Sequence, residues 1–236
     1  MIFKRFFSLV CTALIFLTTY AQQKMKTYDK EWKHIDSLIQ KDGLTESALT
    51  EVNKIYSQAK KEGNDAQLVK ALLYRAELQQ LKEEDATKKS IHQLEAETAE
   101  AKEPVRAVLQ SITARSYWNY FQQHRWQLYR RTNTVNFQKD DMATWTIDDF
   151  NKKISELYLA SISDEKLLQQ TKLEPFDPII TKGNARYLRP TLFDLLAQRA
   201  LEYFKNDESN VNKPAYAFEI NDAAAFDDAK KFMQQM

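Results

Sequence analysis

The chain has 236 residues, with 34 lysines and arginines against 33 aspartates and glutamates, and a formal net charge of +1. Three glycines and five prolines leave few positions for sharp turns, which argues against sandwiches, barrels and nucleotide-binding α/β folds. The balanced charge gives no reason to expect a nucleic acid as a partner. Composition therefore predicts a helical protein and indicates no activity.

The first segment, 1–21, has the three parts of a secretory signal peptide. It begins with Lys4 and Arg5, continues through an apolar run over 6–17 and closes on small residues that end at Ala21. The apolar run is shorter than the roughly 20 residues that a spanning helix needs. We predict a cleaved signal peptide, export to the periplasm or cell surface, and no membrane span after cleavage; an uncleaved anchor is the alternative.

Cleavage would also change the chemistry available to the chain. It would remove Cys11, which is the single cysteine. A mature chain without cysteine has no disulfide, no thiolate nucleophile and no cysteine-ligated metal. Its stability would come from packing alone.

A helical-hairpin region is predicted over 22–131. Apolar residues recur at helical spacing, and glycines mark the stops. The predicted helices run from Tyr28 to a stop at Gly43, from Thr45 as N-cap to a stop at Gly63, and over 65–81, 87–101 and 104–131.

Two of these helices have distinctive patterns. The helix over 87–101 has only a thin apolar seam, so we expect it at the surface. The long helix over 104–131 changes from a one-sided apolar pattern to aromatic residues all round, which places the centre of the core along it.

A linker or long loop is predicted over 132–145, followed by a second helical region over 146–236 that packs on the first and has no obvious C-terminal closure. Thr146 and Asp149 have the spacing of a capping box. The elements predicted after it are a helix through Ile162, a short helix over 164–170, a loop over 173–189 with an extended piece at Ile179 and Ile180, a helix restarting at Pro190 and Thr191, a loop over 206–220 and a last helix over 222–236.

The predicted fold class is therefore all-α. Successive antiparallel helices joined by short turns are typical of helical-hairpin repeats. The spacing of 16 between Trp32 and Ala48 matches a tetratricopeptide (TPR) unit only in part. The hairpins are expected to stack either as an irregular TPR-like solenoid or as an irregular bundle.

Few patterns in the sequence carry chemistry. The histidines His34, His92 and His124 fall on three different predicted helices, so they lack the spacing of a zinc site. Paired acids such as Asp148 and Asp149 point about 100° apart on a helix and are explained by capping and solvation. Phosphate-binding loops, nucleophile elbows and zinc-protease motifs are missing from the sequence. We expect no enzyme, no catalytic or metal site, and no cofactor.

The most unusual stretch is 117–131, in which aromatic residues are interspersed with basic and polar ones. Two hypotheses account for it. The rings are buried in packing, with the arginines at the rim, or they line a groove that binds a peptide or a glycan. The candidate groove residues are Tyr117, Trp118, Tyr120 and Arg125. Stacking on nucleic acid is disfavoured because the chain is near-neutral and has a predicted signal peptide, and because the aromatic residues fall at helical rather than alternating spacing.

Three segments together carry a family likeness: 28–38 with 43–49, 144–146 leading to 158–161, and 188–197 with 199–201. They resemble the N-terminal helical region of large, exported bacterial alpha-2-macroglobulin-like proteins. The resemblance spans essentially the whole mature chain, but its motifs are structural.

The resemblance implies protease trapping by an array of β-sandwich domains, a bait segment and, in many members, a Cys-x-Glu-Gln thioester. The sequence contains none of these parts. The first hypothesis is therefore a non-catalytic helical scaffold or interaction region of such a protein, with the C-terminal domains of a longer parent chain as partner. The alternative is a free-standing periplasmic TPR-like adaptor that binds a partner protein or peptide.

Overall fold

The computed structural model describes residues 27–41, 43–80, 86–129 and 141–206. The described part of the chain is helical, with one isolated bridge between Lys172 and Thr191, so the all-α class is confirmed there. The elements are α2 (Asp29–Gln40), α3 (Thr45–Glu62), α4 (Asp65–Gln80), α5 (Ala86–Glu100), α6 (Val105–Tyr129), the 3-10 helix η1 (Met142–Thr144), α7 (Ile147–Ala160), α8 (Glu165–Gln170), the 3-10 helices η2 (Glu174–Ile179) and η3 (Arg186–Leu188), and α9 (Leu192–Phe204). The predicted signal peptide, most of the predicted linker and the predicted helix over 222–236 lie outside the described residues.

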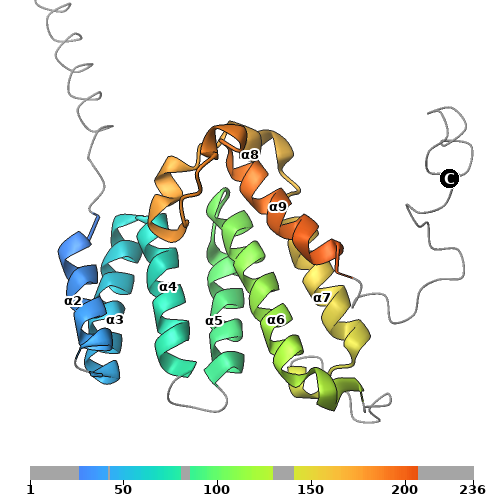
Figure 1. Cartoon of the computed structure of the whole chain (residues 1–236), viewed down its shortest axis with the longest axis horizontal. Helices are drawn as coiled ribbons and strands as arrows, with labels where there is room; N and C mark the ends of the chain where they lie inside the picture. The colour runs from blue at the N-terminus through green and yellow to red at the C-terminus, as the bar shows by residue number, and fades with distance from the viewer. Residues whose placement is uncertain (1–26, 42, 81–85, 130–140, 207–236) are drawn as a thin grey trace, which may run out of the picture.

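The helices α2 to α7 stand side by side in chain order, and successive helices run in opposite directions (Figure 1). Each of them packs against the next. The segment after α7 returns across this row, so that η2 packs on α4 and α9 packs on α6 and α7. Helices that are far apart in sequence therefore meet on one side of the row.

The first three helices share an apolar core. Trp32, Ile35 and Leu38 are buried on α2 at the spacing that the sequence predicts. Gly63 ends α3 in the left-handed conformation, with φ 64°, as its place after the helix predicts. Thr45 is already the first helical residue rather than the cap, because Leu44 occupies the cap position without a side-chain bond.

Helix α5 differs from the expectation of a surface helix. It packs between α4 and α6, with Ile91 and Leu94 buried. Its thin apolar seam is supplemented by polar side chains: Glu97 accepts hydrogen bonds from α3, and Glu95 accepts one from α6. The prediction of a surface helix was wrong because these carboxylates, which the sequence pattern assigns to solvent, make contacts with neighbouring helices.

Tyrosine hydroxyls join helices throughout the row. We call these contacts the tyrosine–carboxylate bonds: Tyr28 to Glu62 (2.5 Å), Tyr56 to Glu97, Tyr74 to Asp36 (2.9 Å) and Tyr117 to Glu95 (2.9 Å). Two of them connect helices that are not neighbours in the chain, α2 with α4 and α3 with α5. Each bond restrains the two helices that it joins from sliding along each other.

The aromatic second half of α6 packs against α7 and α9. Tyr117 and Phe121 are fully buried, as the all-round aromatic pattern predicts. The predicted capping box is present: Thr146 accepts from the backbone N–H of Asp149, whose carboxylate accepts from the backbone N–H of Thr146 at 2.9 Å. A second capping box, which the sequence analysis did not identify, joins Thr191 and Asp194 at the start of α9.

The predicted extended piece at Ile179 and Ile180 is wrong for Ile179, which ends the 3-10 helix η2. Two prolines in η2 hold their own φ angles near the helical value, which suits a 3-10 turn. Leu173 and Phe176, three residues apart, are buried against the helix row.

Candidate functional site

A pocket lies where α4, α6, η2 and α9 meet. It has a volume of about 210 Å³. We call it the arginine pocket, and its lining comprises Leu73, Val108, Ile112, Arg115, Ser116, Asn119, Phe176, Ile179, Ile180, Leu192, Leu195, Leu196 and Arg199. Most of the wall is apolar, and the polar groups are two arginines, a serine and an asparagine.

Helical periodicity explains the polar side of the pocket. Ile112, Arg115, Ser116 and Asn119 recur at intervals of three and four along α6, so they share one face of that helix. This face is distinct from the one that Tyr117 and Phe121 bury against α7.

The opposite wall comes from α9. Leu192, Leu195, Leu196 and Arg199 follow the same helical spacing. The capping box at Thr191 fixes where α9 begins and therefore which residues face α6. Arg199 thus extends an otherwise leucine-rich face toward Arg115.

The charges of Arg115 and Arg199 influence the same nearby ionisable group. Burial lowers the pKa of Arg199, and the positive charge of Arg115 lowers it further, while Tyr158 and Glu202 oppose this change. Burial raises the pKa of Tyr158, and both arginines act against that rise. Two cationic groups of the pocket therefore lie near one buried phenol, that of Tyr158.

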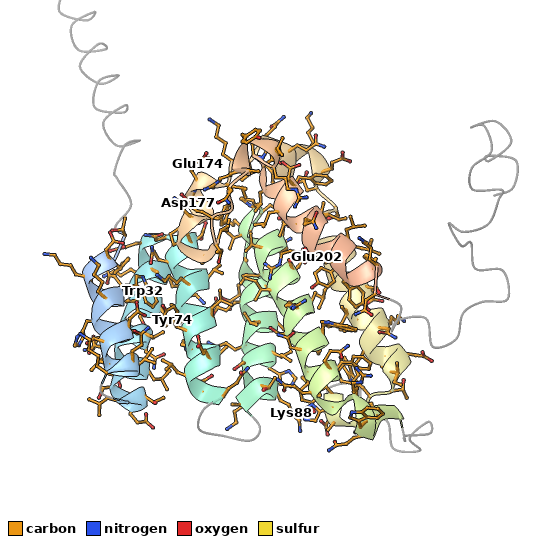
Figure 2. All side chains as sticks on the ribbon, viewed as in Figure 1. Trp32, Tyr74, Lys88, Glu174, Asp177 and Glu202 are labelled. Carbon is orange, nitrogen blue, oxygen red and sulfur yellow. The ribbon has the colours of Figure 1, made fainter. Side chains whose placement is uncertain are left out.

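Neither arginine forms an ion pair within the described residues. No carboxylate oxygen lies within 4.0 Å of the Arg115 or Arg199 guanidinium in this part of the chain. The nearby carboxylate of Glu202 accepts a hydrogen bond of 3.1 Å from Gln198 on the same helix. Figure 2 shows Glu202 on α9. The arrangement leaves two guanidinium groups available to an anion.

The candidate groove from the sequence analysis is a different set of residues, and the structure does not expose it. Tyr117, Trp118 and Tyr120 are 1%, 7% and 6% exposed, inside the core between α6, α7 and α9. Tyr117 stacks on Trp145 at 5.4 Å between ring centroids. The hypothesis of buried packing is confirmed for these rings, because rings packed so fully offer no face to a partner.

Arg125 lies apart from the three rings. Its guanidinium is 5.2 Å from the ring centroid of Trp126, which is 74% exposed. The structure therefore places Arg125 at the rim of the aromatic core. It does not join the arginine pocket.

Sequence reasoning missed Arg115 and Arg199. The available signal was an arginine at a position that continues the apolar face of its helix: Arg115 follows Ile112 by three residues, and Arg199 follows Leu196 by three. Such a residue reads equally well as the edge of a solvated face, so the pattern alone does not identify a site. Only the packing of α9 on α6 brings the two together.

A second surface feature lies on the outer side of α9. Phe193, Ala197 and Leu201 recur every four residues and, with Leu188, line a shallow depression. Leu201 is 53% exposed and Leu188 is 67% exposed. We call this surface the outer α9 face.

Other types of site find no support among the described residues. They contain no group of three metal-ligating side chains and no helix that is long and apolar enough to cross a membrane. Comparisons with protein-family models, curated proteins and solved structures found no match to the chain. The site must therefore be interpreted from its own geometry.

Proposed function

We propose that the chain is an exported, non-catalytic helical interaction module that binds a partner protein or peptide in the arginine pocket. The observation that carries this proposal is a mostly apolar pocket with two arginines that form no ion pair with described residues. Apolar walls with a few converging polar groups are typical of binding sites.

The arrangement of the helices supports a TPR-like module. In stacked helical hairpins, each hairpin packs against the next one along the chain. Here Trp32 on α2 donates to Gln67 on α4 at 2.6 Å, and the hydroxyl of Tyr74 on α4 donates to Asp36 on α2. The first helices of three successive hairpins would be α2, α4 and α6, and the last two line the pocket.

Selection of peptides tests the proposal. A random peptide library displayed on phage is selected against the purified chain from residue 22 onward, and enriched peptides are titrated by calorimetry. Leu73 is 37% exposed at the pocket wall, so Leu73→Ser removes a contact without opening the core. The matched control is Leu159→Ser on α7, which is 55% exposed and outside the pocket.

We expect Leu73→Ser to weaken the enriched peptides roughly tenfold, as loss of one buried aliphatic side chain implies, and Leu159→Ser to leave them unchanged. A library that yields no enriched peptide, or equal loss in both variants, would contradict the proposal. Export is tested separately by N-terminal sequencing of the protein recovered from the cell envelope, where a start at Gln22 is expected.

A second candidate function is favoured by the outer α9 face. Its residues fall within the segment 188–201, which carries part of the resemblance to alpha-2-macroglobulin-like proteins. An exposed apolar helix face is suited to packing against an adjoining domain. In this proposal the chain is the N-terminal scaffold of such a protein, and the outer α9 face contacts its following domains. Sequencing the gene beyond codon 236 tests it: a continuing frame that encodes β-sandwich domains supports the scaffold, and a stop codon contradicts it.

A further inference from the structure

Building on the proposed binding function, we infer that the arginine pocket recognises the free C-terminal carboxylate of a peptide whose last side chain is aliphatic. The carboxylate would lie between Arg115 and Arg199, and the side chain would lie against the wall formed by Ile179, Ile180 and Leu195. This assigns a ligand class and an orientation to the pocket.

The charge of the pocket favours an anion with two acceptor oxygens. A guanidinium group binds a carboxylate through paired N–H donors, and two guanidinium groups can serve both oxygens. The lowered pKa of Arg199 reflects the cost of holding that cation in a partly dry site beside a second cation. A bound carboxylate offsets this cost, and within the described residues no side chain supplies one at ion-pair distance.

The size of the pocket limits what can enter. Its volume of about 210 Å³ is below the roughly 300–1,000 Å³ of sites for drug-sized molecules, so it suits one terminal residue rather than a folded or cyclic ligand. The rest of the peptide would leave through the open side, where Asn119 is exposed. The side-chain amide of Asn119 can then bond to the peptide backbone.

The closeness of charge and apolar wall selects a chain terminus over an internal acid. In a C-terminal residue, the carboxylate and the side chain are attached to the same carbon, so both can occupy one small pocket. An internal aspartate or glutamate carries its carboxylate at the end of the side chain, which leaves the apolar wall uncovered. A phosphate group leaves it uncovered as well.

The test uses N-acetylated tetrapeptides Ac-Ala-Ala-Ala-Leu with either a free acid or an amide at the C-terminus, and Ac-Ala-Asp-Ala-amide as the internal acid. Each is titrated into 15N-labelled protein, and the Nε–Hε signals of Arg115 and Arg199 are followed by NMR. We expect the free acid to shift both signals and to bind at least tenfold more tightly than the amide or the internal acid.

Variants connect the effect to the two arginines. Arg115→Gln and Arg199→Gln should each reduce the ratio of acid to amide affinity about tenfold, and Arg115→Lys should retain part of it. Arg189→Gln removes an exposed arginine outside the pocket and should leave the ratio unchanged. Thermal melts of all variants check that the fold is retained.

The outcomes distinguish failure of carboxylate recognition from failure of peptide binding as a whole. Equal binding of acid and amide would overturn the carboxylate inference while leaving peptide binding intact, as would tighter binding of the internal acid. If peptides enriched from the library bind but no tetrapeptide acid does, the inference is wrong and the proposed function stands. If no peptide of either kind binds, both are wrong.

Discussion

At the scale of single residues, Gln67 is a buried polar side chain with a specific hydrogen-bond partner. Its side chain is 3% exposed, and its carbonyl oxygen accepts a hydrogen bond of 2.6 Å from the indole nitrogen of Trp32. If the acceptor is removed, the buried indole N–H has no water to bond with. The destabilisation by this unsatisfied donor is larger than the net stabilisation that the hydrogen bond itself provides. Figure 2 shows Trp32 and Tyr74 lying together between α2 and α4. Their ring centroids are 4.7 Å apart.

We therefore expect Gln67→Met to lower the free energy of unfolding by about 1–3 kcal/mol, although it keeps the volume of the side chain. The measurement is urea denaturation followed by circular dichroism. Gln58→Met is the matched control, because Gln58 is exposed on α3, and its change should stay within about 0.5 kcal/mol. A Gln67→Met protein as stable as the control would show that the bond does not matter for stability.

At the scale of helices and their ends, α7 and α9 begin with the same device. Both Thr146 and Thr191 cap the backbone N–H of an aspartate three residues later, and that aspartate caps in return. Each box satisfies two backbone donors that the first turn leaves unpaired. Both helices contribute to the core around Tyr203, so fraying at either end affects more than the first turn.

Thr146→Ala and Thr191→Ala should each reduce the free energy of unfolding by about 1 kcal/mol, because each removes one cap. Thr50→Ala is the control in the exposed middle of α3, where alanine favours the helix and stability should hold or rise slightly. Urea midpoints of the three variants give the comparison. If the two caps cost no more than Thr50→Ala, the boxes do not stabilise the helices.

The positions of the helices along the chain could be predicted from the sequence, but the packing contacts between helices could not. Apolar spacing and the stop at Gly63 located α3 and α4, and the box at Thr146 located α7. Periodicity shows which residues share a face, but not which face meets which. The arginine pocket depends on α6 and α9, whose arginines are far apart in the chain, so no local pattern could reveal it. The buried rings were correctly placed in the core, whereas the groove assigned to them was not.

At the scale of the whole molecule, partly or fully buried tyrosines make the stability of the fold decrease at alkaline pH. Burial, helped by Asp36, raises the pKa of Tyr74 from 10.0 to about 12. The folded protein therefore keeps this proton between pH 10 and 12, where the unfolded chain releases it, and stability falls as pH rises through that window. The pKa values of Tyr28, Tyr56 and Tyr117 are also raised by burial and a carboxylate, so the same sign applies to each.

Comparison of the wild type with Tyr74→Phe isolates this effect. At pH 8 the variant should be less stable by about 1 kcal/mol, because it lacks the hydrogen bond to Asp36. The difference should shrink between pH 10 and 12, since phenylalanine has no proton to lose. Urea midpoints are measured for both proteins at each pH. Lysines that titrate in the same range change the stability of both proteins equally, so their effect cancels in the difference. A constant difference across this range would contradict the raised pKa.

The tyrosine–carboxylate bonds also determine how the row of helices carries a mechanical load. Each bond crosses between helices, so a force that slides one helix along another acts on the bond sideways. Two of the four bonds reach past a neighbouring helix, from α2 to α4 and from α3 to α5. A displacement of one helix is thereby passed to the next helix but one, and the first four helices resist shear as a coupled unit rather than as independent pairs.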